Sequence, residues 1–138
     1  MAFLLDTNVV SELRKQRPDA NVVAWHHRHL AADAYISVLA LGEIRQGIER
    51  IRPRDPAQAD ALERWLDRLG AVYRDRVLPI TTEIAQEWGR LGPMGQPPPA
   101  IDGLIAATAL VHHLTLVTRN VADVARTGVP VVNPFQPE

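Results

Sequence analysis

Three acidic residues stand where the surrounding sequence is apolar or small. Asp6 directly follows the apolar run Phe3–Leu5, and Glu43 borders the apolar stripe of a predicted helix. Asp102 is the only charged residue in a very apolar helix predicted over residues 100–112. An acidic residue at the end of a buried strand is either a helix cap or one part of a charged site. The positions of the other acids distinguish these two interpretations.

Each acid has an ordinary structural explanation when it is taken alone. Asp6 could cap the next helix, Glu43 could be a solvated helix residue, and Asp102 could complete a first turn, where the helix dipole favours an anion. Together, however, carboxylates at the strand ends and helix starts of one sheet would converge on one crevice. Two such charges about 4 Å apart repel by roughly 4 kcal/mol at an effective dielectric near 20. A bound cation would have to offset this repulsion.

The expected cation is Mg²⁺ or Mn²⁺. The chain has no cysteine, and no histidine is placed to join the acids, so the ligands would be hard oxygen atoms. Divalent ions held in this way lower the pKa of a bound water and stabilise charge on a phosphate. The three acids therefore predict metal-dependent hydrolysis of a nucleic-acid backbone.

Strands alternate with helices along the chain, which predicts an α/β fold with a mainly parallel sheet and helices on both faces. Asn21 would cap one helix, either Thr81 or Thr82 would cap another, and Gly70 would end a third. The predicted strands are 3–5, 35–37, 77–80, 115–118 and 129–132, with 77–80 at an edge. The predicted helices are 9–14, 22–30, 38–51, 56–69, 82–91 and 100–112, with a short helix or turn at 120–125. The Gly- and Pro-rich segment 92–99 is interpreted as a loop within a single domain, 1–138.

Ligands of parallel sheets bind beyond the carboxyl ends of the strands. Asp6 is expected at such an end, together with Thr118, Arg119 and Asn120.

Composition narrows the class of protein further. Hydrophobic residues make up 46% and charged residues 22%, as in ordinary folded proteins, and the net charge of -1 argues against a generally basic nucleic-acid-binding surface. This net charge does not exclude a local basic groove. All basic residues except Lys15 are arginine, which either serves phosphate recognition or reflects a GC-rich genome. No apolar run approaches the roughly 20 residues of a membrane span, and no secretion signal is evident, so a cytoplasmic location is expected.

Several linked blocks resemble the PIN-domain ribonucleases, especially the VapC and FitB toxins of bacterial toxin-antitoxin pairs. The blocks are LDTN at 5–8, ISVLALGEIRQG at 36–47, IDGLIAATAL at 101–110, LTLVTRN at 114–120 and VVNPF at 131–135. The resemblance implies a three-layer α/β/α sandwich, an endoribonuclease dependent on Mg²⁺ or Mn²⁺, and a homodimer. It further implies inhibition by an antitoxin that carries a DNA-binding domain.

The same resemblance implies that Asp6, Glu43 and Asp102 are the metal-binding catalytic acids. The helical hairpin from Glu43 to Leu69 would belong to the clip that grips the antitoxin, which would insert an arginine or similar residue among the acids.

One position departs from the family pattern. Many members carry a fourth acid where this chain has Asn120, and the next acid, Asp123, is one helical turn further on. A single tightly held ion is therefore expected, with Asp123 as a candidate substitute for the missing acid. Thr7 and Thr118 are expected to hydrogen-bond the acids or the water. The alternative is a catalytically weak PIN domain that binds RNA or its antitoxin without cutting.

Other chemistry-bearing residues have simpler interpretations. The histidines are expected at the surface or partly packed, and the tryptophans in the core or at a dimer contact. The arginine cluster between residues 45 and 54 is read as a solvated face that could instead contact RNA. A haloacid-dehalogenase phosphatase would need an aspartate at Asn8, and no glycine-rich phosphate loop occurs. The residues concerned are His26, His27, His29, His112, His113, Trp25, Trp65, Trp88, Arg45, Arg50, Arg52 and Arg54.

Overall fold

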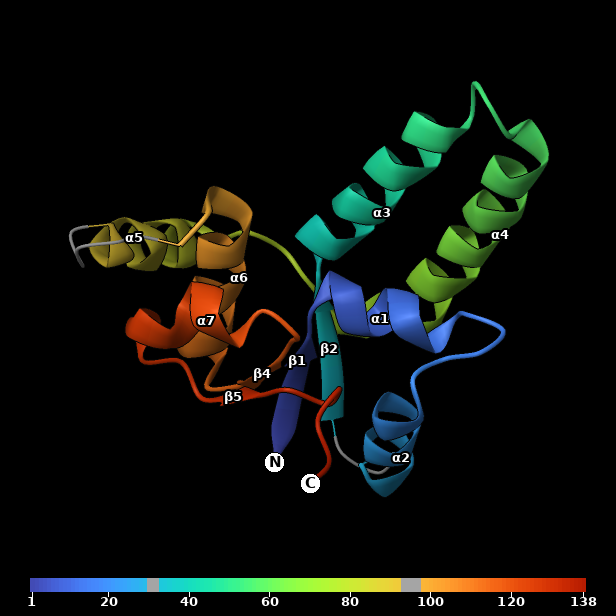
Figure 1. Cartoon of the computed structure of the whole chain (residues 1–138). Coiled ribbons are helices and arrows are strands. Elements are labelled where there is room, and N and C mark those ends of the chain that lie inside the picture. Colours follow the sequence, from blue (N-terminus) through green and yellow to red (C-terminus); the bar gives the residue numbers. More distant parts are fainter. Residues whose placement is uncertain (30–32, 93–97) are drawn as a thin grey trace.

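A computed structural model describes residues 1–29, 33–92 and 98–138 of the chain. Its centre is a sheet whose strand order is β3-β2-β1-β4-β5 (Figure 1). Every pairing between neighbouring strands is parallel, which confirms the predicted fold class. β1 is the middle strand, and β3 lies at an edge as predicted. The strands are β1 Ala2–Leu5, β2 Asp33–Ser37, β3 Val77–Leu78, β4 Thr115–Val117 and β5 Val131–Val132.

Helices cover both faces of this sheet, because successive residues of a strand point to opposite sides. Phe3 and Leu5 of β1 pack into one apolar cluster with α1 to α4, and Leu4 packs into a second cluster with α5 to α7. The result is the predicted three-layer α/β/α arrangement. The helices are α1 Thr7–Leu13, α2 Ala20–Arg28, α3 Val38–Ile51, α4 Pro56–Val72, α5 Thr82–Leu91, α6 Ala100–His112 and α7 Val121–Val124. Two 3-10 turns complete them, η1 Arg74–Arg76 and η2 Ala125–Thr127.

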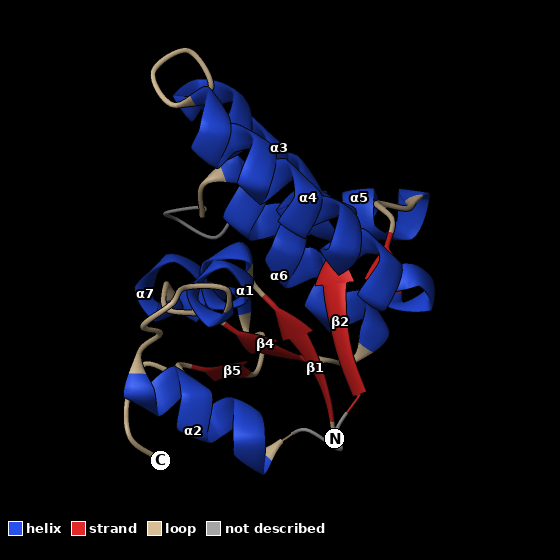
Figure 2. Cartoon of the chain, turned by 90° about the vertical axis from the view of Figure 1, so that its right-hand side faces the viewer, coloured by secondary structure: helices blue, strands red, loops and turns tan. Residues whose placement is uncertain are grey.

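The helical hairpin of α3 and α4 extends past the carboxyl ends of the strands (Figures 1 and 2). Apolar residues of both helices, among them Ile48 and Leu66, belong to the cluster shared with α1 and α2. Near the tip, Arg52 binds Glu49, Asp60 and Glu63, and Arg45 binds Glu49 and Glu63. Exposed ion pairs contribute little one at a time, so this network mainly fixes how the two helices lie against each other.

Three predicted helix boundaries are wrong. The first helix begins at Thr7 instead of Val9, because Asp6 is its N-cap and accepts a hydrogen bond from the Thr7 N–H. The cap of α2 is Asp19 instead of Asn21, since the Asp19 carboxylate accepts the N–H groups of Asn21 and Val22. α4 continues past Gly70 to Val72.

The other helix boundaries agree closely with prediction, but β2 begins at Asp33 instead of residue 35, β3 ends at Leu78 instead of residue 80, and β5 begins at Val131 instead of residue 129. Thr81 caps α5 through the Ile84 N–H, and α6 has the predicted limits. Most of the predicted loop, residues 93–97, and the predicted end of the second helix at residue 30 lie outside the described residues. Within the described ranges, none of the helices combines the length and apolar character that a membrane span requires.

Candidate active site

Asp6 lies at the carboxyl end of the central strand, and its backbone N–H donates to the Val117 carbonyl at 2.9 Å. The side chain is 6% exposed. One carboxylate oxygen accepts the Thr7 N–H at 2.8 Å, and the other accepts the Thr118 hydroxyl at 2.7 Å. Burial raises the pKa of Asp6, and these two hydrogen bonds act in the opposite direction. Asp6 is therefore both the helix cap and a member of the charged group, so the two interpretations do not exclude each other.

Glu43 reaches the same place from α3. Ser37 ends β2 and caps α3 by accepting the Leu39 N–H at 3.0 Å, so the strand turns directly into the helix that carries Glu43. The Thr7 hydroxyl donates to Glu43 Oε1 at 2.6 Å. Thr7 thus links two of the acids, because its N–H binds Asp6 and its hydroxyl binds Glu43.

Asp102 lies in the first turn of α6 and experiences the charges of the other acids. The pKa of Asp102 is raised to about 6, first by burial and then by the negative charges of Asp6, Asp123 and Glu43. Acids from the end of β1, from α3, from α6 and from α7 therefore act on one another at one edge of the sheet. In the described part of the chain, every charge that contributes to this shift is negative.

This group of acids fits a hard divalent cation. Each carboxylate can accept about four hydrogen bonds or ligand contacts, and Asp6 and Glu43 use only part of that capacity. Across residues 1–29, 33–92 and 98–138, however, the side chains of three acids or histidines are nowhere gathered tightly enough to form a ready ligand shell. Mg²⁺ commonly uses one or two carboxylates and keeps several waters, so it does not require the acids to form a complete ligand shell.

The polar residues predicted to support the acids are distributed unevenly. Thr118 is 1% exposed and binds Asp6, whereas Asn120 is exposed and reaches the site only through its backbone N–H, which donates to Thr118 Oγ1 at 3.0 Å. Asp123 is also exposed and acts on Asp102 through its charge.

Asn8 is a member of the site that the sequence reasoning missed. Its amide nitrogen lies 3.4 Å from both Asp6 Oδ2 and Thr118 Oγ1, and its oxygen accepts the Arg119 N–H at 3.3 Å. The signal was the unbroken polar run after β1, which places three polar side chains at the start of α1.

Replacing Thr118 by valine is expected to lower RNA cleavage by roughly tenfold or more. The substitution removes the hydroxyl that favours charged Asp6 and leaves the Asn120 N–H without its acceptor, which together cost about 1–3 kcal/mol. Steady-state cleavage rates and urea unfolding would measure both effects. Thr127→Val is the matched control, because the buried Thr127 hydroxyl donates to the Val124 carbonyl and accepts the Val129 N–H, whereas the Thr118 hydroxyl donates to Asp6 and accepts the Asn120 N–H. Equal losses of activity in the two variants would contradict the assignment of Thr118.

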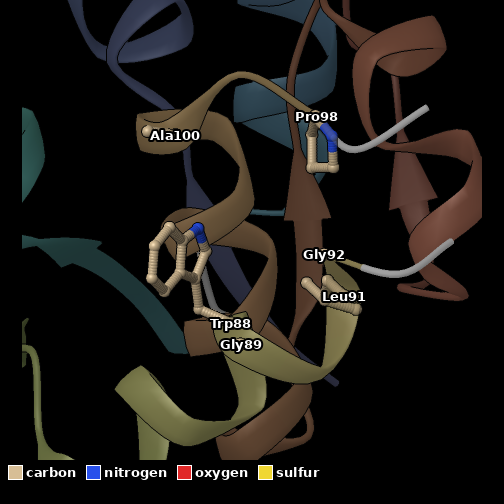
Figure 3. Close-up of a pocket in the computed structure, with 6 residues that line it drawn as sticks. All are labelled: Trp88, Gly89, Leu91, Gly92, Pro98 and Ala100. Atoms are coloured by element: carbon tan, nitrogen blue, oxygen red, sulfur yellow. The ribbon is translucent and has the colours of Figure 1, made fainter. Parts of the chain in front are cut away.

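Two cavities differ in their relation to the acids. One of about 410 Å³ lies between the end of α5 and the start of α6 and is lined by Trp88, Gly89, Leu91, Gly92, Pro98 and Ala100 (Figure 3). It contains none of the acids. A Cβ at Gly103 would lie 3.1 Å from the Trp88 indole, so glycine at this position allows the close packing of the indole against α6. The second cavity, about 280 Å³, runs between α1, α3 and α4 and includes Thr7, Glu43, Arg14 and Trp65.

The remaining candidates mostly have structural roles. Trp25 is in the core, and the His29 ring packs against both Trp25 and Phe3, with centroid distances of 4.7 and 5.3 Å. Trp65 packs partly against the core, whereas Trp88 remains 42% exposed on this chain. Arg45 and Arg52 are occupied by the hairpin network.

Comparison with known proteins places these features in a family. The chain matches the PIN domain over residues 3–128. It is 29% identical to VapC ribonuclease Y4jK of Sinorhizobium fredii, over 98% of this chain and 99% of that protein. It is 31% identical to toxin FitB of Neisseria gonorrhoeae, over 96% of this chain and 98% of that protein.

Solved structures agree with the sequence matches. The crystal structure of FitAcB from Neisseria gonorrhoeae superposes with a TM-score of 0.88 at 31% identity, covering 97% of this chain and 99% of that chain. A toxin-antitoxin complex from Klebsiella pneumoniae gives a TM-score of 0.67 at 25% identity, covering 96% and 98%. The parallel sheet, the acids at its carboxyl edge and these matches agree: this chain belongs to the PIN domain family.

Proposed function

We propose that the chain is a divalent-metal-dependent endoribonuclease and the toxin of a toxin-antitoxin pair, with Asp6, Glu43 and Asp102 as its metal-binding catalytic acids. The observation that carries this proposal is the meeting of the acids beyond the carboxyl end of β1, where Thr7 binds both Asp6 and Glu43 and the charges of these two acids act on Asp102. A group of acids that repel one another in this way favours a cation at its centre. The ribonuclease and toxin names of the relatives support the same activity.

The chain's own residues divide the work. The Thr118 hydroxyl and the Thr7 N–H favour the charged form of buried Asp6, and the Thr7 hydroxyl orients Glu43. Asp102 enters from the opposite layer, so the three acids approach the substrate phosphate from separate elements. Asn8 fixes the spacing between Asp6 and Thr118.

Mg²⁺ or Mn²⁺ held by these acids would lower the pKa of a water that attacks the phosphodiester and would stabilise the developing negative charge. Because Asn120 carries no charge and Asp123 is exposed, we propose one principal ion, with Asp123 as an outer acid that attracts it.

The proposed protein partner is an antitoxin with a DNA-binding domain. The cavity between α1, α3 and α4 begins at Thr7 and Glu43 and extends along the hairpin to Ile51 and Gln58. A peptide lying in this cavity would reach the acids. The toxin-antitoxin complex among the structural neighbours supports such a partner. We also propose a homodimer, for which Val38, Trp88 and Ile101 offer exposed apolar side chains.

The decisive experiment compares the wild type with Asp6→Asn on total RNA in the presence of Mg²⁺. Asparagine also caps helices well, so the variant keeps α1 while losing the charge. We expect cleavage to fall by at least about a hundredfold, since metal assistance supplies several kcal/mol. Asp19→Asn makes the same change at the cap of α2 and is expected to cleave normally. Equal cleavage by the wild type and Asp6→Asn would refute the metal-site assignment, and RNA binding without cleavage by the wild type would favour the non-catalytic alternative.

A further inference from the structure

Arg119 is an exposed arginine whose side chain is held in place beside the acid site. Its guanidinium carbon lies 3.7 Å from the centroid of the Phe135 ring, so the planar group lies against the face of the ring. Its backbone is also fixed, because the Arg119 N–H donates to Asn8 Oδ1 and the preceding residue, Thr118, binds Asp6. An exposed arginine normally samples many rotamers, whereas this one is preorganised.

The aromatic support is itself anchored by the segment that follows β5. The Phe135 N–H donates to Asn133 Oδ1 at 3.0 Å, and the Phe135 carbonyl accepts the Asn21 side-chain amide of α2 at 2.9 Å. Further along, Glu138 accepts from Arg28 of α2 at 2.7 Å. Figure 2 shows this last segment running to α2. The segment thus ties Arg119 to the helix layer on the α1 and α2 side.

The donors of Arg119 remain available. Within the described ranges no carboxylate forms an ion pair with it, and the nearby Glu12 is already bound by Lys15 and by the Asp19 N–H. A guanidinium stacked on an aromatic ring keeps its N–H groups in the plane, where they match the geometry of a phosphate.

The charge of Arg119 helps to locate that phosphate. The pKa of Glu12 is lowered first by Lys15 and the Asp19 N–H, with a smaller contribution from Arg119. Arg119 thus stands beside the acid site, with its charge acting on Glu12 of α1 and its backbone N–H on Asn8, which suits a phosphate that flanks the cleaved one.

We infer that Arg119, held against Phe135, binds a backbone phosphate of the RNA next to the scissile position. This inference rests on the proposed function and adds a substrate-binding subsite to it. Phe135 acts as a positioning residue, because it contacts the arginine and not the substrate.

The test measures RNA binding as a function of KCl concentration in an Asp102→Asn background, at constant Mg²⁺. The probe is a labelled RNA oligonucleotide that spans a cleavage position mapped with the wild type. Arg119→Gln is expected to weaken binding roughly tenfold, because it removes a charged hydrogen-bonding partner. It should also reduce the slope of log affinity against log salt by about 0.7 to 0.9, the value for one lost phosphate contact. Arg119→Lys should keep the slope and recover part of the affinity.

Two further variants separate this role from general effects. Arg74→Gln removes an exposed arginine of η1, the turn that precedes edge strand β3, and should leave both affinity and slope unchanged. Phe135→Leu should weaken binding when Arg119 is present and have no effect on binding when Arg119 is glutamine.

If Arg119→Gln leaves the salt slope unchanged while the wild type cleaves RNA, the inference is overturned and the proposed function still stands. If Arg119→Gln loses antitoxin binding but binds RNA as before, Arg119 contacts the protein partner, and the inference is likewise overturned. If the wild type neither binds nor cleaves RNA, the proposed function itself fails.

Discussion

Replacing Asp102 by asparagine is expected to abolish RNA cleavage and, at the same time, to stabilise the metal-free protein at neutral pH. The cleavage loss follows from the removal of a proposed metal ligand and should be at least about a hundredfold. The gain in stability follows from the repulsion that the folded chain imposes on this carboxylate. Asp102 would then be required for cleavage, although its charge lowers the free energy of unfolding of the metal-free protein.

The sign of the stability effect can be worked out from the pKa. Folding raises the pKa of Asp102 from 3.8 to about 6, so between these values the folded chain binds more protons than the unfolded chain. The contribution of Asp102 to the free energy of unfolding therefore falls as pH rises through this window. One pKa unit corresponds to about 1.4 kcal/mol, but Asp102 is only half-buried, so we expect roughly 1–2 kcal/mol after screening by solvent.

Urea unfolding in the presence of a chelator would measure this effect. The difference between Asp102→Asn and the wild type should be near zero at the low end of the window and should grow until the pH exceeds the folded pKa. Asp67→Asn, an exposed acid of α4, is the matched control and should change neither stability nor cleavage appreciably. A variant that is less stable than the wild type at neutral pH would show that the acids do not repel one another in the folded chain.

The sequence was sufficient to predict the parts of the site that depend on local pattern. The apolar run before Asp6 is too short for a helix, whereas the long apolar segment around Asp102 is a helix, and in a parallel sheet the carboxyl end of a strand and the amino end of the helix that leads into the next strand lie at the same edge. The acid ends of β1 and α6 could therefore be placed without any knowledge of packing. The same reasoning gave the order of helices and strands and the edge position of β3.

The contacts around Asp6 could not be predicted in this way. Asn8 belongs to the site because Thr118, far along the chain, lies beside it in the folded sheet. No local pattern encodes that pairing, which depends on β1 and β4 being neighbours in register. The stacking of Arg119 on Phe135 was missed for the same reason, since it joins the end of β4 to the segment after β5.

The wrong helix boundaries have different causes. Asp19 and Asn21 are both good caps, and the choice between them depends on which side chain reaches the free N–H groups at the start of α2. α4 continues through Gly70 to Val72 and brings its C-cap residue, Tyr73, against the core cluster of this layer. A glycine inside a helix costs about 1 kcal/mol, less than the burial of a large side chain contributes, so packing overrides the local preference.

The second large effect is expected for Leu4→Ala, which should lower the free energy of unfolding by about 3–5 kcal/mol. Leu4 is fully buried on the central strand, where it pairs with Tyr35 of β2 and Leu116 of β4 and packs against the α5 and α6 layer. Small domains are commonly stable by only 5–15 kcal/mol, so this cavity would remove a large part of the total. Urea unfolding of both proteins would measure the loss.

The consequence for activity should be much smaller than the consequence for stability. Asp6 is held by hydrogen bonds to Thr7, Thr118 and the Val117 carbonyl. The Leu4 side chain makes none of these bonds, and it packs on the opposite face of the sheet from Val117. At temperatures where Leu4→Ala remains folded, its cleavage rate per folded molecule should therefore stay within a few-fold of the wild type. Leu78→Ala makes the same substitution on the half-buried edge strand β3 and should cost less than half as much stability. If the central and edge variants lost equal stability, burial at the centre of the sheet would not be what sets the cost of the Leu4 cavity.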